Sequence, residues 1–153
     1  MELVAIKKTF RVDGGAPCPV IISDDNNLRL IFYGSENATE EERIIGLKFI
    51  SVFYHSFGPP NGEALDGHPY YDLGLGQFDF CELLNSDLVE KLGKMGRFHP
   101  YYNPAAYNTK HHYIIPFKES VFECVSDSFE VSVQEATIYD RAVSIIYQPF
   151  KAN

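Results

Sequence analysis

Residues 111–125 read HHYIIPFKESVFECV, and this stretch predicts a β-hairpin around which the fold is organised. Two runs rich in β-branched and aromatic side chains, 111–117 and 121–125, are typical of strands. The polar residues 118–119 between them predict a short turn, although Lys-Glu is not a pair that the tightest hairpin turns favour. The two runs are therefore expected to pair as antiparallel neighbours.

The turn sets the register of the hairpin, in which Ile115 faces Phe122 and Ile114 faces Glu123. Because side chains alternate across a strand, one face of the hairpin is predicted to be apolar. Its members are Tyr113, Ile115, Phe122 and Cys124. On the other face, His112 and Glu123 are diagonal neighbours, close enough for their side chains to meet.

At 153 residues the chain is most simply one domain, expected to span 1–148 and to end in a C-terminal tail at 149–153. Its net charge of −8 argues against nucleic acid and against an anionic membrane surface as partners. The N-terminus lacks the apolar segment of a secretion signal, so a cytoplasmic protein is expected. The cysteines form no CxxC pair, and Cys81 and Cys124 lie in strand-like runs, where buried thiols are predicted.

Short alternating segments separated by turn residues recur along the chain and predict a mainly β fold. We expect eight to nine strands in an antiparallel β-sandwich or barrel. A long strand is predicted over 44–54 and a last strand over 142–147. One short helix is predicted over about 87–95, because the polar residues 85–87 supply an N-cap and apolar residues follow at helical spacing.

Two long loops, 55–76 and 97–110, are rich in tyrosine and histidine. The first contains five glycines and three prolines, which predicts irregular structure throughout it. Tyrosine-rich loops are typical of recognition surfaces. The candidate ligand-binding residues are Tyr70, Tyr71, Tyr101, Tyr102 and Tyr107. Alternatively, each ring packs under its own loop and forms a small separate core.

Two further kinds of site are compatible with the sequence. His68 and His99 each begin a His-Pro-Tyr-Tyr sequence and are candidate metal ligands if the two loops converge, in which case a divalent metal such as zinc would be the cofactor. Without that convergence no cofactor is expected. His112 and Glu123 are candidate catalytic residues, since a partly desolvated carboxylate beside an imidazole can transfer protons. The alternative is a solvent-facing glutamate with a histidine as its surface neighbour.

Two segments, FGPPNGEALDGHPYYDLGL at 57–75 and HHYIIPFKESVFECVSDSFEV at 111–131, resemble a group of small uncharacterised bacterial proteins. The shared phrases are PN-EAL-GHP and HYI-F-S-FEC, and the resemblance covers residues 13 to about 131. It implies a single domain and brings no activity, cofactor or site residue with it. Lys118 departs from the pattern, which favours His or Asp at that position.

The sequence therefore favours a soluble binding domain that recognises a protein or small ligand through the loops 55–76 and 97–110. The alternative is a small metal- or carboxylate-dependent enzyme that uses the same loops together with His112 and Glu123.

Overall fold

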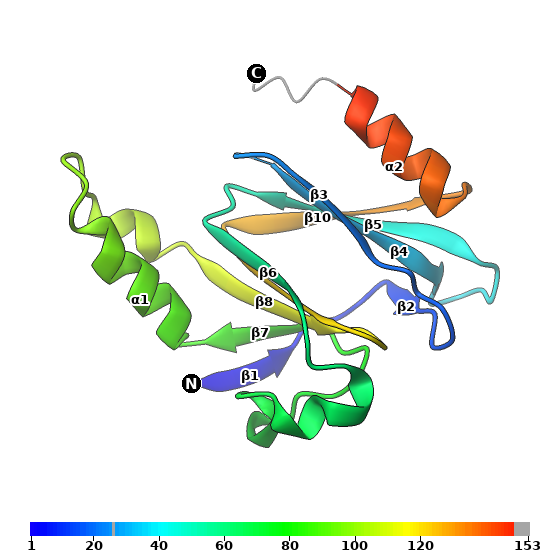
Figure 1. The fold of residues 1–153 in the computed structure, drawn as a ribbon, viewed down its shortest axis with the longest axis horizontal. Helices are drawn as coiled ribbons and strands as arrows, with labels where there is room; N and C mark the ends of the chain where they lie inside the picture. Colours follow the sequence, from blue (N-terminus) through cyan, green and yellow to red (C-terminus); the bar gives the residue numbers. More distant parts are fainter. Residues whose placement is uncertain (26, 149–153) are drawn as a thin grey trace. The chain divides into compact units, whose positions relative to one another are not determined.

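The computed structural model describes residues 1–25 and 27–148, which form two five-stranded antiparallel sheets with two α-helices. Neither sheet closes into a barrel, so the predicted mainly β, antiparallel fold is confirmed in its two-sheet form. The chain divides into two compact units, and each unit contains one of the sheets (Figure 1). The predicted C-terminal tail, 149–153, lies outside the described residues.

The first unit comprises Met1–Lys7 and Phe53–Ser128, and its sheet has the order β1-β7-β8-β9-β6. The strands are β1 (Glu2–Ala5), β6 (Tyr54–Gly58), β7 (Cys81–Leu84), β8 (His111–Pro116) and β9 (Val121–Ser126). Helix α1 (Asp87–Gly96) begins directly after β7 and confirms the predicted helix. The connections contain three short 3-10 helices, η1 (Gly62–Gly67), η2 (Tyr71–Leu73) and η3 (Pro104–Tyr107).

The hairpin β8–β9 pairs in the predicted register, with Ile114 opposite Glu123 and Ile115 opposite Phe122. The face predicted to be apolar is buried, since Tyr113, Ile115, Phe122 and Cys124 all have 5% or less of their surface exposed. On the opposite face of the sheet, side chains of the strands form a second apolar cluster with side chains of η1 and of the segment after η2. Its members are Leu65, Leu75, Cys81, Leu83, Ile114 and Val121.

The second unit comprises Lys8–Val52 and the chain from Phe129 onward, and its sheet has the order β10-β5-β4-β2, with β3 also paired to β4. The elements are β2 (Phe10–Val12), β3 (Val20–Ser23), β4 (Leu28–Glu36), β5 (Arg43–Ile50), β10 (Ser128–Gln134) and helix α2 (Ile138–Tyr147). In the described part of the chain, no helix has the length and apolar character needed to cross a membrane.

The prediction of a last strand over 142–147, and with it of only one helix, is wrong, because these residues belong to α2. Thr137 caps the helix by accepting a hydrogen bond from the Asp140 N–H. Ile138, Ala142 and Ile145 recur at helical spacing and pack in a cluster with Ile31 and Ile44 of the sheet. The apolar residues of 138–147 that pack against the sheet therefore lie on one side of a helix, and they do not alternate as they would in a strand.

The predicted strand over 44–54 is also wrong beyond Ile50, where β5 ends. Ser51 has a positive φ of 54°, a conformation that breaks the extended backbone, and the next strand β6 begins at Tyr54. The loop 55–76 is consequently more regular than predicted, since it starts inside β6 and contains η1 and η2.

The three cysteines, all of which lie within the described residues, form no disulfide, and the two predicted to be buried are buried. Burial raises the pKa of the Cys124 thiol to about 12, so thiolate is scarce there at neutral pH. We therefore expect 5,5′-dithiobis(2-nitrobenzoate) to titrate one thiol of the native protein rapidly, the exposed Cys18, and the other two only in denaturant. Cys18→Ser should remove the fast reaction, and a second fast thiol in the native protein would contradict the assignment.

Candidate functional site

Two histidines of the first unit converge on one carboxylate of the hairpin. The Nε2 atom of His112 lies 2.8 Å from Oε2 of Glu123, and the Nε2 atom of His68 lies 3.2 Å from Oε1. Both imidazoles are buried, with side chains 0% and 5% exposed, whereas the Glu123 side chain is 18% exposed. The predicted contact between His112 and Glu123 is therefore confirmed, and the alternative of a solvent-facing pair is not what the fold contains.

The second ring nitrogen of each imidazole, Nδ1, also forms a hydrogen bond. The Oγ atom of Ser86 lies 2.7 Å from Nδ1 of His112, and the backbone N–H of Tyr70 donates to Nδ1 of His68 at 3.2 Å. Because an N–H donor requires an acceptor, Nδ1 of His68 carries no proton and its Nε2–H donates to Glu123. The same arrangement suits His112, with Nδ1 accepting from the Ser86 hydroxyl. We call these four residues the Glu123 cluster: His68, Ser86, His112 and Glu123.

The charge state of Glu123 follows from its neighbours. Burial by itself would raise the pKa of this carboxyl, but the hydrogen bonds that it accepts from His112 and His68 outweigh burial and hold the pKa below its usual range. Glu123 is therefore ionised at neutral pH, and its two oxygens each accept from one imidazole.

His68 reaches Glu123 because the first long loop is anchored through η1. The Asn61 side chain caps η1 by accepting from the Ala64 N–H, and Leu65 is buried in the apolar cluster below. His68 is the C-cap of η1, where its N–H donates to the Leu65 carbonyl at 2.9 Å. The ring of Tyr70 covers both imidazoles, with centroids 5.4 Å from His68 and 5.9 Å from His112.

Ser86 enters the cluster at the junction between β7 and α1. It is the N-cap of α1 and accepts from the Val89 N–H at 3.3 Å. The residue before it, Asn85, has a positive φ of 53°, so the chain turns sharply between strand and helix. From the sequence, Ser86 was predicted only as part of a helix start. The one signal for a role in the site is its position in the turn that follows a buried strand.

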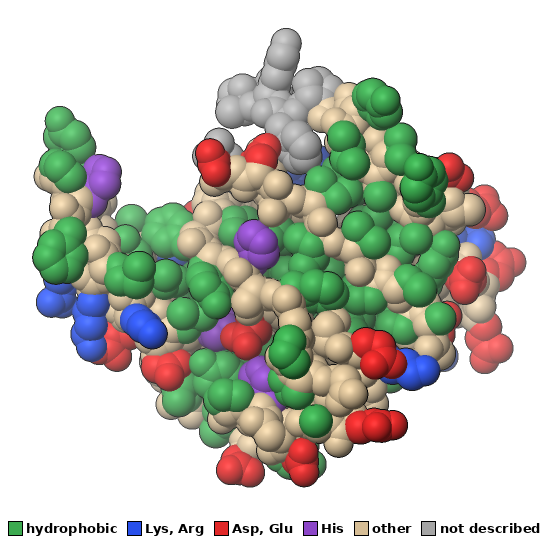
Figure 2. Space-filling model, viewed as in Figure 1, with side chains coloured by type: hydrophobic (Ala, Val, Ile, Leu, Met, Phe, Trp, Pro, Cys, Tyr) green, Lys and Arg blue, Asp and Glu red, His purple; other side chains and the backbone are tan. Residues whose placement is uncertain are grey.

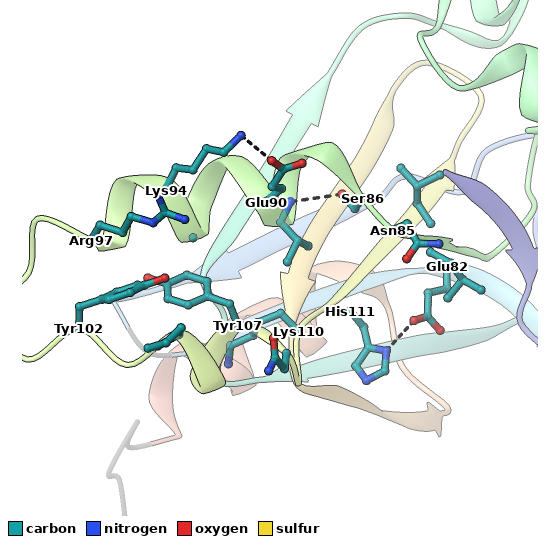
Figure 3. A pocket seen from close by; sticks show the side chains of 16 residues that line it. Glu82, Asn85, Ser86, Glu90, Lys94, Arg97, Tyr102, Tyr107, Lys110 and His111 are labelled. Carbon is teal, nitrogen blue, oxygen red and sulfur yellow. Dashed lines mark hydrogen bonds and ion pairs between the residues drawn. The ribbon is translucent and has the colours of Figure 1, made fainter.

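A pocket of about 540 Å³ lies between α1, the end of β7 and the loop 97–110, and we call it the α1 pocket (Figure 3). Ser86 lines it, as do His111 and Glu82, whose side chains are joined by a hydrogen bond of 2.6 Å. In Figure 3, Lys94 and Arg97 lie on the helix side of the pocket, and Tyr102 and Tyr107 lie on the other side.

The wall formed by the two tyrosines is held against α1 by close packing. The ring of Tyr107 lies over Gly93 and Gly96, and a Cβ atom at Gly96 would clash with the Tyr107 hydroxyl. Tyr107 also contacts the ring of Phe53 edge-on at 5.3 Å and that of Tyr102 at 5.9 Å. The two glycines weaken the helix, and in return the loop can approach its backbone.

The predicted ligand-binding tyrosines therefore fall into separate places. Tyr102 and Tyr107 line the α1 pocket, and Tyr71 lines a second hollow between η1 and η2. Tyr70 donates to Asp87 at 3.0 Å, and burial, followed by that hydrogen bond and the Asp87 charge, raises the pKa of its hydroxyl. Tyr101 is 87% exposed. The alternative of rings packed under their own loops fits Tyr70 and Tyr107 in part.

The two candidate metal ligands have different neighbours. Nε2 of His68 is hydrogen-bonded to Glu123, whereas Nδ1 of His99 accepts from the Tyr101 N–H at 3.1 Å and its ring lies beside that of Tyr101. Among residues 1–25 and 27–148, no group of three or more His, Cys, Asp or Glu side chains is placed to hold a metal ion.

Comparison with known proteins adds no further constraint: no family model, no curated protein and no solved structure matches the chain.

Proposed function

We propose that this protein is a binding domain that takes up a small organic ligand with an anionic group in the α1 pocket. The observation that carries the proposal is the preformed wall of Tyr102 and Tyr107, which lies opposite the part of α1 that carries Lys94 and Arg97 (Figure 3). The volume of about 540 Å³ lies within the range of small-molecule sites, roughly 300–1,000 Å³, so a small ligand is favoured over a protein.

The charges around the pocket support an anion. Lys and Arg side chains gather over α1 on the face shown in Figure 2, although the chain as a whole has a net charge of −8. Lys94 is paired with Glu90 at 2.5 Å, whereas Arg97 has no ion pair within the described residues. A guanidinium offers a planar pair of donors that matches a carboxylate or phosphate, and the tyrosine rings offer apolar surface beside it.

In this proposal the loop 97–110 supplies the tyrosine wall of the site. The loop 55–76 supports the site from behind, because it places Tyr70 against the ring of His112 and His68 against Glu123. A cytoplasmic setting suits a chain with an exposed free thiol at Cys18.

The proposal is tested by calorimetric titration with benzoate and phenyl phosphate, and with benzyl alcohol as the uncharged analogue. We expect the two anions to bind and Arg97→Gln to weaken them about tenfold or more, because one charge-assisted contact contributes roughly 1.5–3 kcal/mol. The matched control is Lys91→Gln, an exposed cation on the same helix that does not line the pocket. Equal binding of benzyl alcohol, or an equal loss in Lys91→Gln, would refute the proposal.

A second candidate function is enzymatic, and the 2.8 Å contact between His112 and Glu123 is the observation that favours it. Of the metal- and carboxylate-dependent forms of this candidate, the carboxylate-dependent form has the stronger support, because both imidazoles point a nitrogen at Glu123.

A further inference from the structure

We propose that Ser86 is a nucleophile, activated by His112 and Glu123, and that the protein hydrolyses esters of small carboxylic acids bound in the α1 pocket. This inference rests on the proposed function, since the carboxylate released by the hydrolysis would be the anion held there. The three side chains come from the β7–α1 junction, β8 and β9.

The three side chains form a continuous chain of hydrogen bonds that ends at the pocket. Ser86 Oγ is 2.7 Å from His112 Nδ1, and His112 Nε2 is 2.8 Å from Glu123 Oε2. A hydroxyl, an imidazole and a carboxylate in this order are the parts of a serine nucleophile, its general base and the group that orients the base. Of the three residues, Ser86 is the one that lines the pocket, so the serine end of the chain is the end next to the space where a ligand would be held.

The surroundings hold His112 in the tautomer that this chemistry requires. Its side chain has no exposed surface, and the ring of Tyr70 packs edge-on against it. Glu123 accepts the Nε2–H and leaves Nδ1 free to take a proton from Ser86. His68 occupies the other carboxylate oxygen and so fixes the direction in which Glu123 points.

The reaction balances without any further reactant except water. As Ser86 Oγ forms a bond to the ester carbonyl carbon, its proton moves to His112 Nδ1. The same proton then passes to the departing alcohol oxygen as the C–O bond breaks, which leaves an acyl-serine. Water loses a proton to Nδ1 and attacks the acyl carbon, and that proton returns to Ser86 Oγ as the carboxylic acid leaves.

The helix start offers donors for the oxyanion of both tetrahedral intermediates. The first N–H groups of a helix have no intrahelical acceptor, and in α1 the Val89 N–H is taken by Ser86 Oγ. Within the part of the chain that the structure describes, the N–H groups of Asp87 and Leu88 have no hydrogen-bond acceptor, and they lie in the same turn as the nucleophile, where backbone donors stabilise developing negative charge.

A purely structural role for Ser86 as a helix cap explains less of this arrangement. The capping contact to Val89 is 3.3 Å long, whereas the contact to the buried imidazole is 2.7 Å. Capping requires only an acceptor oxygen, which Asp or Asn supplies equally well, and it requires no imidazole behind the hydroxyl.

The test is covalent labelling of the native protein with a fluorophosphonate, in which Ser86 Oγ displaces fluoride from phosphorus. We expect one adduct per chain, mapped to Ser86 by peptide mass spectrometry, and hydrolysis of p-nitrophenyl acetate that the label abolishes. Ser86→Asn keeps a capping side chain and should lose both properties. The control is Ser23→Ala, an exposed serine of β3 in the second unit, which should change neither.

His112→Asn should slow labelling by at least 100-fold, as expected for loss of a general base. Because labelling of the unmodified protein depends on no variant, a misfolded variant does not leave the question open: a folded wild-type protein with no adduct at Ser86 overturns the proposal. If benzoate binds and no adduct forms, the nucleophile is refuted and the binding function stands. If Ser86 is labelled but neither benzoate nor phenyl phosphate binds, the anion-binding function is the one refuted.

Discussion

Replacement of Phe122 by alanine is expected to lower the free energy of unfolding by about 3–5 kcal/mol. Phe122 lies in β9 opposite Ile115 of β8, and none of its surface is exposed. Removal of the ring takes away its transfer free energy and leaves a cavity that the close-packed surroundings fill only partly. Urea denaturation, with an unchanged slope against denaturant, is the measurement.

Phe57 provides the matched control, because it is paired with Phe122 on the neighbouring strand β6 but is 44% exposed. Phe57→Ala should cost clearly less, about 1 kcal/mol, since a partly exposed ring leaves no closed cavity. A cost below about 1 kcal/mol for Phe122→Ala, or equal costs for the two variants, would show that the apolar face of the hairpin has been assigned wrongly.

The hairpin could be predicted from sequence because its information is local. A period of two fixes which side chains share a face, and one turn fixes the register, so the contact between His112 and Glu123 followed from residues 11 positions apart. The prediction of a strand over 142–147 was wrong because the local sequence there does not distinguish a strand from a helix. A short apolar run fits a buried strand and a buried helix equally, and the cap at Thr137 was the signal that could have separated them.

The rest of the candidate site could not be predicted because it comes from distant segments. His68 and Glu123 are 55 residues apart, and Ser86 and His112 are 26 apart. No periodicity links a 3-10 helix in a loop to the middle of a sheet, and only the pairing order β7-β8-β9 brings the β7–α1 junction near β8. The repeated His-Pro-Tyr-Tyr sequence suggested a common site, yet His68 joins the Glu123 cluster and His99 contacts Tyr101.

Removal of the Glu123 carboxylate is expected to have the second large effect. Glu123→Ala should lower the free energy of unfolding by about 2–4 kcal/mol at pH 7, because two buried imidazole N–H groups lose their acceptor at roughly 1–3 kcal/mol each. Water entering past a side chain that is 18% exposed offsets part of this cost. Glu119→Ala, an exposed glutamate in the turn of the same hairpin, should stay within about 0.5 kcal/mol.

The pH dependence of the free energy of unfolding distinguishes the contribution of the Glu123 charge from that of its shape. Hydrogen bonds from His112 and His68 hold the pKa of this carboxyl below its usual range, so the folded protein binds the proton more weakly than the unfolded chain does. A lowered pKa contributes stability that is fully present above the unfolded value, about 4.3, and is lost as pH falls through the folded value. Glu123→Gln has nearly the same shape and cannot ionise.

We therefore expect the difference in unfolding free energy between the wild-type protein and Glu123→Gln to be largest near pH 7 and to shrink below about pH 4. At low pH the protonated carboxyl presents an O–H donor to the imidazoles in place of one acceptor oxygen, as the amide presents its NH2 group at every pH, so the two proteins converge. Urea denaturation at a series of pH values between about 7 and 3 measures the difference, with Glu119→Gln as the control. A difference that stays constant over this range would show that the ionised form of Glu123 is not what the two buried histidines stabilise, and the relay proposed for Ser86 would then lose the charge that orients its base.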